Sequence, residues 1–175
     1  MSVNGQLPVE RFLQTLRLVS REGNHLLYSH GRLYSQPVDV TWVQGLDSRP
    51  ELAERLEAFV SRFGRMQDTI ADKLLPRWLL ALAETPGSQI ETLNRAERLG
   101  VVSNVESWLE ARKLRNRLVH EYMEDAEAFA EDLALAREYS TMLLDTFNHL
   151  RNFAAKRMEI EKATLPELLD LPRQD

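Results

Sequence analysis

Apolar residues recur at helical spacing over two long stretches of the chain. From Leu52 to Leu82, each apolar position follows the one before it by three or four residues. The same spacing returns from Phe129 to Phe153. No alternation of apolar and polar residues, which would be typical of a strand, extends over a comparable length. Because steps of three or four residues keep side chains on one face of an α-helix, the pattern predicts long amphipathic helices.

Local signals mark where several of these helices should begin and end. Three segments read Ser-x-x-Glu, the sequence of a capping box, and they begin at Ser48, Ser88 and Ser103. Gly100 follows Leu99 and predicts a left-handed stop for the helix that starts near Ser88. Pro76 lies inside the first apolar stretch, so we expect it to kink or end that helix.

The fold predicted from these signals is all-α. The expected helices span residues 9–33, 49–83 with a bend near Pro76, 89–99, 104–122 and 126–160. Residues 35–48, with Pro37 and Gly45, are expected to form a loop. We therefore predict one domain over residues 1–162, an up-and-down helical bundle of about five helices. A tail over residues 163–175 should be loosely attached, and its leucines could dock on the body or on a partner.

Composition narrows the class of protein further. The chain has 175 residues, 43% of them hydrophobic, which suits one globular domain with a sizeable core. It contains no cysteine, so disulfides, thiolate nucleophiles and cysteine-ligated metals are excluded. No apolar run is long enough to span a bilayer, and the N-terminus lacks the basic start and apolar segment of an export signal. We expect a cytoplasmic protein with no membrane partner.

The charge of the chain argues against general coating of nucleic acid, because 22 basic and 27 acidic residues leave a net charge of −5. One local basic site remains compatible with that balance. Arg112, Lys113, Arg115 and Arg117 lie within six residues of one predicted helix. This cluster could offset nearby glutamates along the helix, or it could hold a phosphate.

The helix predicted over residues 104–122 has two distinct faces at about 100° per residue. Its apolar positions form a core side made of Trp108, Ala111, Leu114, Leu118 and Tyr122. Asn116 and His120 point in nearly the opposite direction and stack one turn apart, with Arg112 beside them and Arg115 on the flank. From periodicity alone, His120 is either an idle surface residue or part of a site that faces a partner.

These residues resemble a known family. The pattern Arg115-Asn116-x-x-x-His120-x-Tyr122, with Leu118-Val119 before the histidine and a long helix after it, is similar to the R-x4-H-x-Y signature of HEPN domains. It resembles in particular the small bacterial HEPN proteins encoded beside minimal nucleotidyltransferases. The specific part of the resemblance covers about twenty residues, and the chain is longer than the smallest members through its 35–48 loop and its tail.

The resemblance implies a role for each matching residue. Arg115 and His120 would correspond to the catalytic pair of a metal-independent endoribonuclease that needs no cofactor. Asn116 matches the polar position that often follows the arginine, and it would orient groups or hydrogen-bond RNA. Arg112 is not part of the family pattern, but it lies beside Asn116 and is also expected to bind the substrate. Tyr122 would be structural or would be the tyrosine that a partner nucleotidyltransferase adenylylates to silence the toxin. Such proteins form homodimers in which two motifs meet across a two-fold axis.

Three functions remain open on this basis. The first is a HEPN-type endoribonuclease, the toxin of a toxin–antitoxin pair, that cuts RNA at a homodimer interface and is neutralised by a minimal nucleotidyltransferase antitoxin. Its chemistry is plausible because histidine exchanges protons near neutral pH and arginine grips phosphate. The second is a non-catalytic subunit that binds a nucleotide or substrate for such a nucleotidyltransferase. The third is a HEPN scaffold that only dimerises.

Other candidate sites are weaker. His25 and His30 are five residues apart, a spacing that does not align two imidazoles on one helix face for a metal ion. His149 lies among helical apolar positions and is expected to be structural or on the surface. Asp68 and Asp72 fall on a long amphipathic helix, where a solvated charged face is the usual explanation. The three tryptophans, Trp42, Trp78 and Trp108, are expected to be packing residues.

Overall fold

The computed structural model describes residues 3–120 and 124–173, and for residues 3–6 and 120 only the backbone. The described chain is helical and contains no strand, which confirms the predicted all-α bundle. Its helices are α1 (Val3–Leu33), α2 (Val40–Gln44), α3 (Pro50–Thr69), α4 (Leu75–Ala81), α5 (Gln89–Arg98), α6 (Val105–His120) and α7 (Ala126–Lys156). A π-helical turn, η2 (Ile70–Leu74), joins α3 to α4, and short 3-10 turns are η1 (Leu46–Ser48) and η3 (Lys162–Thr164).

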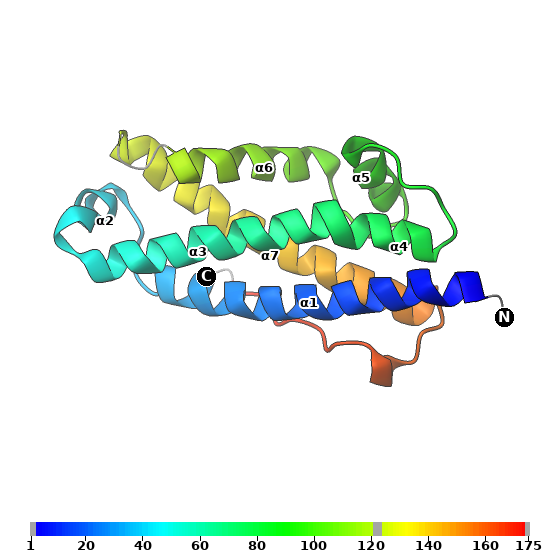
Figure 1. Cartoon of the computed structure of the whole chain (residues 1–175). Coiled ribbons are helices and arrows are strands. Elements are labelled where there is room, and N and C mark those ends of the chain that lie inside the picture. The colour runs from blue at the N-terminus through cyan, green and yellow to red at the C-terminus, as the bar shows by residue number, and fades with distance from the viewer. Residues whose placement is uncertain (1–2, 121–123, 174–175) are drawn as a thin grey trace.

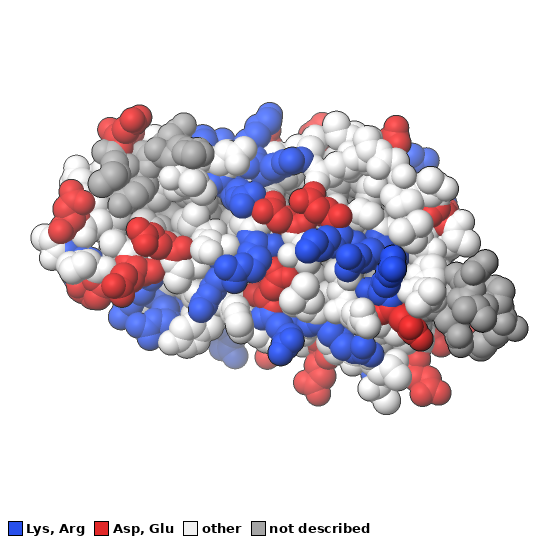
Figure 2. Space-filling view, viewed as in Figure 1, with Lys and Arg blue, Asp and Glu red and all other residues white. Residues whose placement is uncertain are grey.

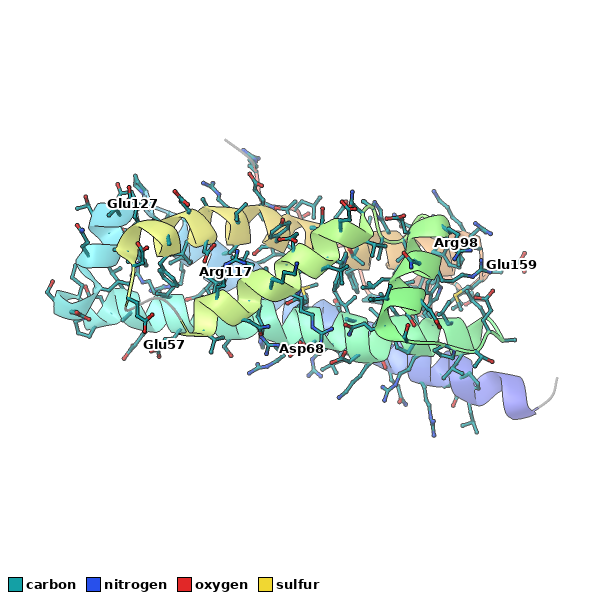
Figure 3. All side chains as sticks on the ribbon, turned by 90° about the horizontal axis from the view of Figure 1, so that it is seen from above. Glu57, Asp68, Arg98, Arg117, Glu127 and Glu159 are labelled. Carbon is teal, nitrogen blue, oxygen red and sulfur yellow. The ribbon has the colours of Figure 1, made fainter. Side chains whose placement is uncertain are left out.

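The long helices pack in an up-and-down arrangement. α1 runs antiparallel to the continuous α3–α4 rod, and α7 crosses behind both (Figure 1). α6 lies over α3 and α7, with α5 at one end of the bundle (Figures 1 and 3). One contiguous core lies between these helices, with Phe12, Phe59, Phe63 and Trp78 fully buried. Trp42 and Trp108 are also buried, so the packing role expected for the tryptophans is confirmed.

The predicted capping boxes have different outcomes. Ser88 forms the complete box: its Oγ accepts from Glu91 N at 3.2 Å, and its own N–H donates to Glu91 Oε2 at 3.2 Å. The boxes predicted at Ser48 and Ser103 are wrong. α3 begins at Pro50, one residue after the predicted start at residue 49, and no side chain caps it. At the start of α6, Ser107 N donates to the side chain of Asn104, so Asn104 rather than Ser103 caps the helix.

The predicted helix stop at Gly100 is confirmed, and of the two outcomes expected at Pro76, a kink or an end of the helix, the structure excludes the end. Gly100 has φ +79°, and Val101 N donates to Ala96 O at 2.9 Å, which closes the end of α5. The rod does not end at Pro76. Instead its ladder widens into the π turn just before the proline, and Leu75 N donates to Ile70 O. Proline lacks an N–H, so a local change of ladder is a way to pass it without ending the helix.

Several boundaries differ from the prediction. α1 begins at Val3 rather than at residue 9 and includes Pro8. Because Pro8 lies near the N-terminus of the helix, its missing N–H disrupts little of the hydrogen bonding. The expected 35–48 loop contains α2 and η1, which are held by the buried side chains of Trp42, Val43 and Leu46. Such short elements leave no readable periodicity. α7 ends at Lys156 rather than at residue 160.

The C-terminal tail is not loosely attached. Leu165 and Leu169 are buried against the body, while Leu168 and Leu171 are exposed. The backbone of Leu169 exchanges two hydrogen bonds with the amide of Asn148, at 2.8 and 2.9 Å. The tail therefore docks along α1 and α7 over residues 165–169 (Figure 1). Within the described residues, no helix is long and apolar enough to cross a bilayer.

Candidate functional site

α6 presents its apolar face to the core as the sequence predicted. Trp108, Ala111, Leu114 and Leu118 are each at most 2% exposed. The fifth predicted core position, Tyr122, lies outside the described residues. Because this face is buried between α3 and α7, the opposite face of α6 is turned to solvent (Figure 3).

The predicted site residues on that outer face have different surroundings. Asn116 and Arg112 are exposed, and the guanidinium of Arg112 donates to the amide oxygen of Gln89. Gln89 in turn donates to Asp72 Oδ1 at 2.7 Å, so Arg112 belongs to a chain of polar contacts between α6, α5 and η2. His120 is the last residue of α6, and its side chain lies outside the description.

Arg115 is held against α3 by an ion pair that the sequence did not reveal. Its Nη1 lies 2.9 Å from Asp68 Oδ1, and the two side chains are 34% and 47% exposed. The guanidinium can approach α3 closely because residue 64 is glycine. A Cβ placed on Gly64 would lie 2.8 Å from Arg115 Nε. Asp68 is therefore a specific partner of Arg115 rather than only part of a solvated face.

A groove of about 410 Å³ lies beside this ion pair, between α3, η2 and α6, and we call it the α3–α6 groove. Its charged lining residues are Arg65, Asp68, Asp72, Lys73 and Arg115, and its rim includes Thr69 and Val119. Figure 2 shows basic side chains gathered over this face of the molecule with acidic ones interleaved among them. The groove offers three cationic groups at a single concave surface, although the chain as a whole is acidic.

Sequence reasoning missed the α3 and η2 residues of this groove. The spacing of these residues could have predicted a polar stripe on this helix. Polar residues recur every three to four positions opposite the core positions, at Arg65, at Asp68 or Thr69, and at Asp72 or Lys73. What the spacing could not show is that this polar stripe faces α6. That pairing depends on how the two helices are rotated in the bundle.

A buried carboxyl group lies beneath the groove. Glu22, on α1, is 8% exposed, and Thr69 Oγ1 donates to its Oε2 at 2.9 Å. Burial raises the pKa of Glu22, while the bond from Thr69 and the nearby charges of Arg65 and Lys73 oppose the rise. Among the described residues, its other oxygen, Oε1, has no hydrogen-bond partner.

The basic cluster predicted on this helix is divided between two sides of the bundle. Arg117 turns away from the groove and bonds Asp132 on α7 through Nη2, at 3.0 Å, and Nε, at 3.1 Å (Figure 3). Lys113 pairs with Glu110 on its own helix. Only Arg112 and Arg115 remain on the side of α3. The fork between Arg117 and Asp132 joins α6 to α7 and has a structural role.

The other histidines are far from a metal-binding arrangement. His25 is exposed, and His30 is buried beside Tyr34. His149 is structural, with Nδ1 3.2 Å from Val101 O and Nε2 3.6 Å from Asp145 Oδ1. Over residues 3–120 and 124–173, no group of three His, Asp or Glu side chains gathers closely enough to hold a metal ion.

The fold and the groove together define an all-α helical-bundle protein with a charged cleft between two of its helices. Comparison with protein-family models, with curated proteins and with solved structures finds no match to this chain. The functional argument therefore rests on the chemistry of the α3–α6 groove and on the sequence pattern that begins at Arg115.

Proposed function

We propose that this protein is a metal-independent endoribonuclease of the HEPN type, which cleaves RNA at a site shared by two copies of the chain. The observation that carries the proposal is the position of Arg115. Its side chain is about one third exposed at the edge of a groove that also contains Arg65 and Lys73. The histidine of the same sequence pattern, His120, ends α6 a little more than one turn further on.

The residues of this region suit cleavage of a phosphodiester. The reaction must remove a proton from the 2′-hydroxyl, protonate the leaving oxygen and stabilise charge on the phosphoryl oxygens. Histidine gains and loses a proton near neutral pH, so His120 is the group proposed for proton transfer. The guanidinium of Arg115 can hold two phosphoryl oxygens at once. Arg65 and Lys73 would contact neighbouring phosphates of the strand.

The ion pair between Arg115 and Asp68 is compatible with phosphate binding. Both side chains are more than one third exposed, and exposed ion pairs contribute at most about 1 kcal/mol. The monoanionic phosphodiester of an RNA strand could therefore replace Asp68 at the guanidinium at little cost. In the free protein Asp68 keeps Arg115 extended over Gly64 and toward the groove.

Helix geometry favours a site that combines residues of two chains. Residues five apart on an α-helix are separated by about 7.5 Å along the axis and by about 140° around it. Arg115 and His120 of one chain thus face different directions. A two-fold dimer brings the arginine of one copy toward the histidine of the other and supplies two of each. Val119 lies at the rim of the groove and is 53% exposed, an apolar side chain that a second copy could bury.

Cleavage of a labelled RNA by the purified protein tests this proposal. With excess chelator present, we expect wild-type cleavage to persist. The His120→Ala variant should be slower by about 10²–10⁴-fold and Arg115→Ala by about 10²–10³-fold. Lys113→Ala is the matched control, since Lys113 is an exposed cation of the same helix that forms an ion pair with Glu110. Equal cleavage by wild type and His120→Ala would show that the assignment is wrong.

The shared site can be tested separately from the activity. Coexpression of differently tagged Arg115→Ala and His120→Ala chains, followed by two-step purification, isolates the mixed dimer. In a shared site this dimer keeps one arginine and one histidine on opposite chains, so cleavage returns. If each site lies within one chain, neither half is complete and the mixed dimer stays inactive.

The proposed role in the cell is that of a toxin restrained by a minimal nucleotidyltransferase. Overexpression of the wild type should arrest growth, and Arg115→Ala should relieve the arrest. Tyr122, which lies outside the described residues, is the proposed site of modification. Incubation with the nucleotidyltransferase and ATP should add one AMP to the wild type and none to Tyr122→Phe. Arrest that persists undiminished in Arg115→Ala would contradict the role of the arginine.

A second candidate function is a non-catalytic subunit that partners a minimal nucleotidyltransferase. The observation that favours it is the exposed apolar side chain of Val119 beside charged groups of both signs, which a partner with complementary charges could cover. Coexpression with a nucleotidyltransferase from the adjacent reading frame tests it. A stable complex that Val119→Asp disrupts, together with no RNA cleavage by the free protein, would favour this candidate over the nuclease.

A further inference from the structure

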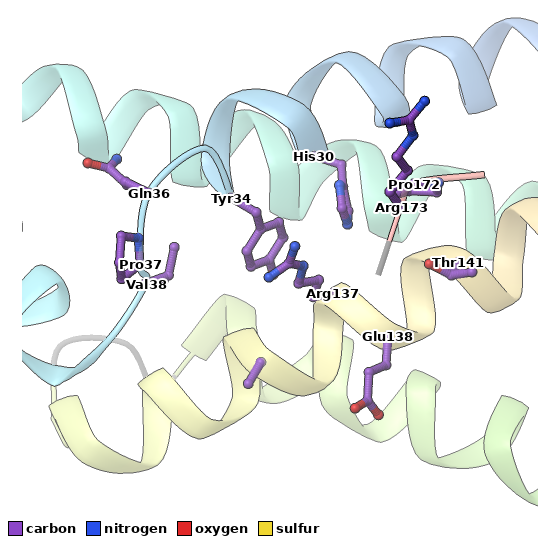
Figure 4. Close-up of a pocket in the computed structure, with 11 residues that line it drawn as sticks. His30, Tyr34, Gln36, Pro37, Val38, Arg137, Glu138, Thr141, Pro172 and Arg173 are labelled. Carbon is purple, nitrogen blue, oxygen red and sulfur yellow. The ribbon is translucent and has the colours of Figure 1, made fainter. Parts of the chain in front are cut away.

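A second pocket, separate from the α3–α6 groove, forms where four parts of the chain meet. The end of α1, residues 36–38, α7 and the end of the tail enclose about 360 Å³ (Figure 4). This volume is at the lower end of the range of small-molecule sites. The pocket has one apolar side, formed by residues such as Pro37, Val38 and Pro172, and one polar side on α1 and α7.

The polar side is organised around Arg137 of α7. Its guanidinium lies over the ring of Tyr34, with Cζ 5.4 Å from the ring centroid. Tyr34 is itself anchored, because its hydroxyl donates to Leu133 O at 2.5 Å. Among the residues that the structure describes, Arg137 forms no salt bridge. Glu138, the carboxylate of the pocket lining, is exposed and points away from Arg137 (Figure 4). A half-buried guanidinium is thus left available to an anion.

His30 adds a second polar group beside this cation. The residue is 5% exposed, its ring centroid lies 4.8 Å from that of Tyr34, and its ring is directed toward the space between Arg137 and the tail (Figure 4). Its Nε2 is buried and has no hydrogen-bond partner among the described residues. Because a buried polar atom without a partner is costly, a polar group of a ligand that enters the pocket would gain a hydrogen bond at this nitrogen.

The charge state of His30 suits a role as a neutral hydrogen-bonding group. Burial lowers the pKa of His30 to about 4, the positive charge of Arg137 acts in the same direction, and an interaction with the backbone of Arg137 opposes the shift. At neutral pH the imidazole is therefore uncharged and keeps one N–H donor and one acceptor nitrogen. Arg137 is then the cation that lies over the ring of Tyr34, and Arg173 of the tail is a second, exposed cation at the rim.

The docked tail completes the apolar wall. Leu169 is buried, and its backbone forms hydrogen bonds with the side chain of Asn148. These contacts position the residues that follow, including Pro172, beside the pocket. Pro172 then faces the segment that contains Pro37 and Val38 from the other side of the cavity (Figure 4). A ligand that fits must combine an anionic end at Arg137 with an apolar body between these two walls.

We propose that this pocket binds a small organic anion, with its carboxylate or phosphate held by Arg137 and His30 and its apolar body packed between Pro37 and Pro172. The inference is independent of the ribonuclease proposal, because none of the residues involved lines the α3–α6 groove. A guanidinium that forms no salt bridge with the described residues favours a negatively charged head group and can bind it in a bidentate manner.

Two probe pairs test the proposal on the full-length protein. Adenosine 5′-monophosphate and benzoate are the anions, and adenosine and benzamide are their uncharged counterparts. Affinity is measured by calorimetry, and the histidine Cε1–Hε1 signals are followed by NMR, since the chain has only four histidines. We expect at least one anion to bind and to shift the His30 signal, which is identified by its loss in His30→Gln. Its uncharged counterpart should bind at least about tenfold more weakly, because a hydrogen bond to a charged group is lost.

Variants locate the binding and keep the proposal falsifiable. Arg137→Gln should weaken binding by about tenfold or more, Arg173→Ala by less, and Arg21→Gln, an exposed arginine outside the pocket, should leave it unchanged. Thermal melts check that each variant is folded. Binding by the phosphate or by the carboxylate probe decides the head group. The proposal is overturned if neither anion binds, if the uncharged compounds bind equally well, or if folded Arg137→Gln binds like wild type.

Discussion

Gly64 has two effects that its replacement by alanine would separate. It leaves room for the guanidinium of Arg115, and it lowers the stability of α3. Gly64 lies in the interior of α3 and is buried beneath the guanidinium. The new methyl group would lie 2.8 Å from Arg115 Nε and 3.3 Å from Cζ and Nη2, closer than van der Waals contact allows. The atoms that must move belong to a flexible side chain that is 34% exposed, so we expect Arg115 to swing outward and α3 to stay in place.

Two opposing effects set the size of the change in stability. Glycine in a helix interior is less favourable than alanine by about 0.8–1.0 kcal/mol, so the substitution stabilises α3 by that amount. The displaced Arg115 loses its pair with Asp68, which contributes at most about 1 kcal/mol at this exposure. The free energy of unfolding of Gly64→Ala should therefore lie between no change and a gain of about 1 kcal/mol.

A double-mutant cycle isolates the clash. Urea denaturation followed by circular dichroism is compared for wild type, Gly64→Ala, Arg115→Ala and the double variant. In the Arg115→Ala background the methyl group meets no guanidinium, so Gly64→Ala should give the full gain of about 1 kcal/mol. If Gly64→Ala instead destabilises by more than about 2 kcal/mol in both backgrounds, the methyl group meets the backbone or core, and the reasoning fails.

Three further changes have outcomes that the structure predicts. Leu169→Ala should lower the free energy of unfolding by about 2 kcal/mol in urea titrations, because the tail leucine is buried against the body; an unchanged midpoint would mean that the tail is undocked. Ser88→Ala should lower the free energy of unfolding by about 1 kcal/mol and Ser103→Ala by less than half of that, since of these two serines only Ser88 caps a helix. Equal losses would contradict this assignment of the caps. Stability should fall by about 2–3 kcal/mol as pH drops from the ordinary pKa of histidine, about 6.5, toward 4. The reason is that the unfolded state protonates His30 while the folded state holds its pKa at about 4, and His30→Gln should remove this part of the pH dependence.

The sequence alone determined the helical class, most helix boundaries and the buried face of α6. These features depend on residues that are close together in the chain. The spacing of apolar positions selects the face, as the burial of Trp108 and Leu114 shows, and a serine hydroxyl reaches the amide only three residues on, as at Ser88. The same local pattern placed Asn116 on the solvent side.

Only the tertiary structure decided which side chains meet between helices. Arg115 and Asp68 are 47 residues apart, and Arg117 meets Asp132 rather than a phosphate-binding surface. Periodicity shows which side of a helix is polar, but the partner of that side depends on how neighbouring helices are rotated and spaced. The docking of Leu169 is likewise set by the shape of the surface that α1 and α7 form together, and that surface exists only once the bundle has packed.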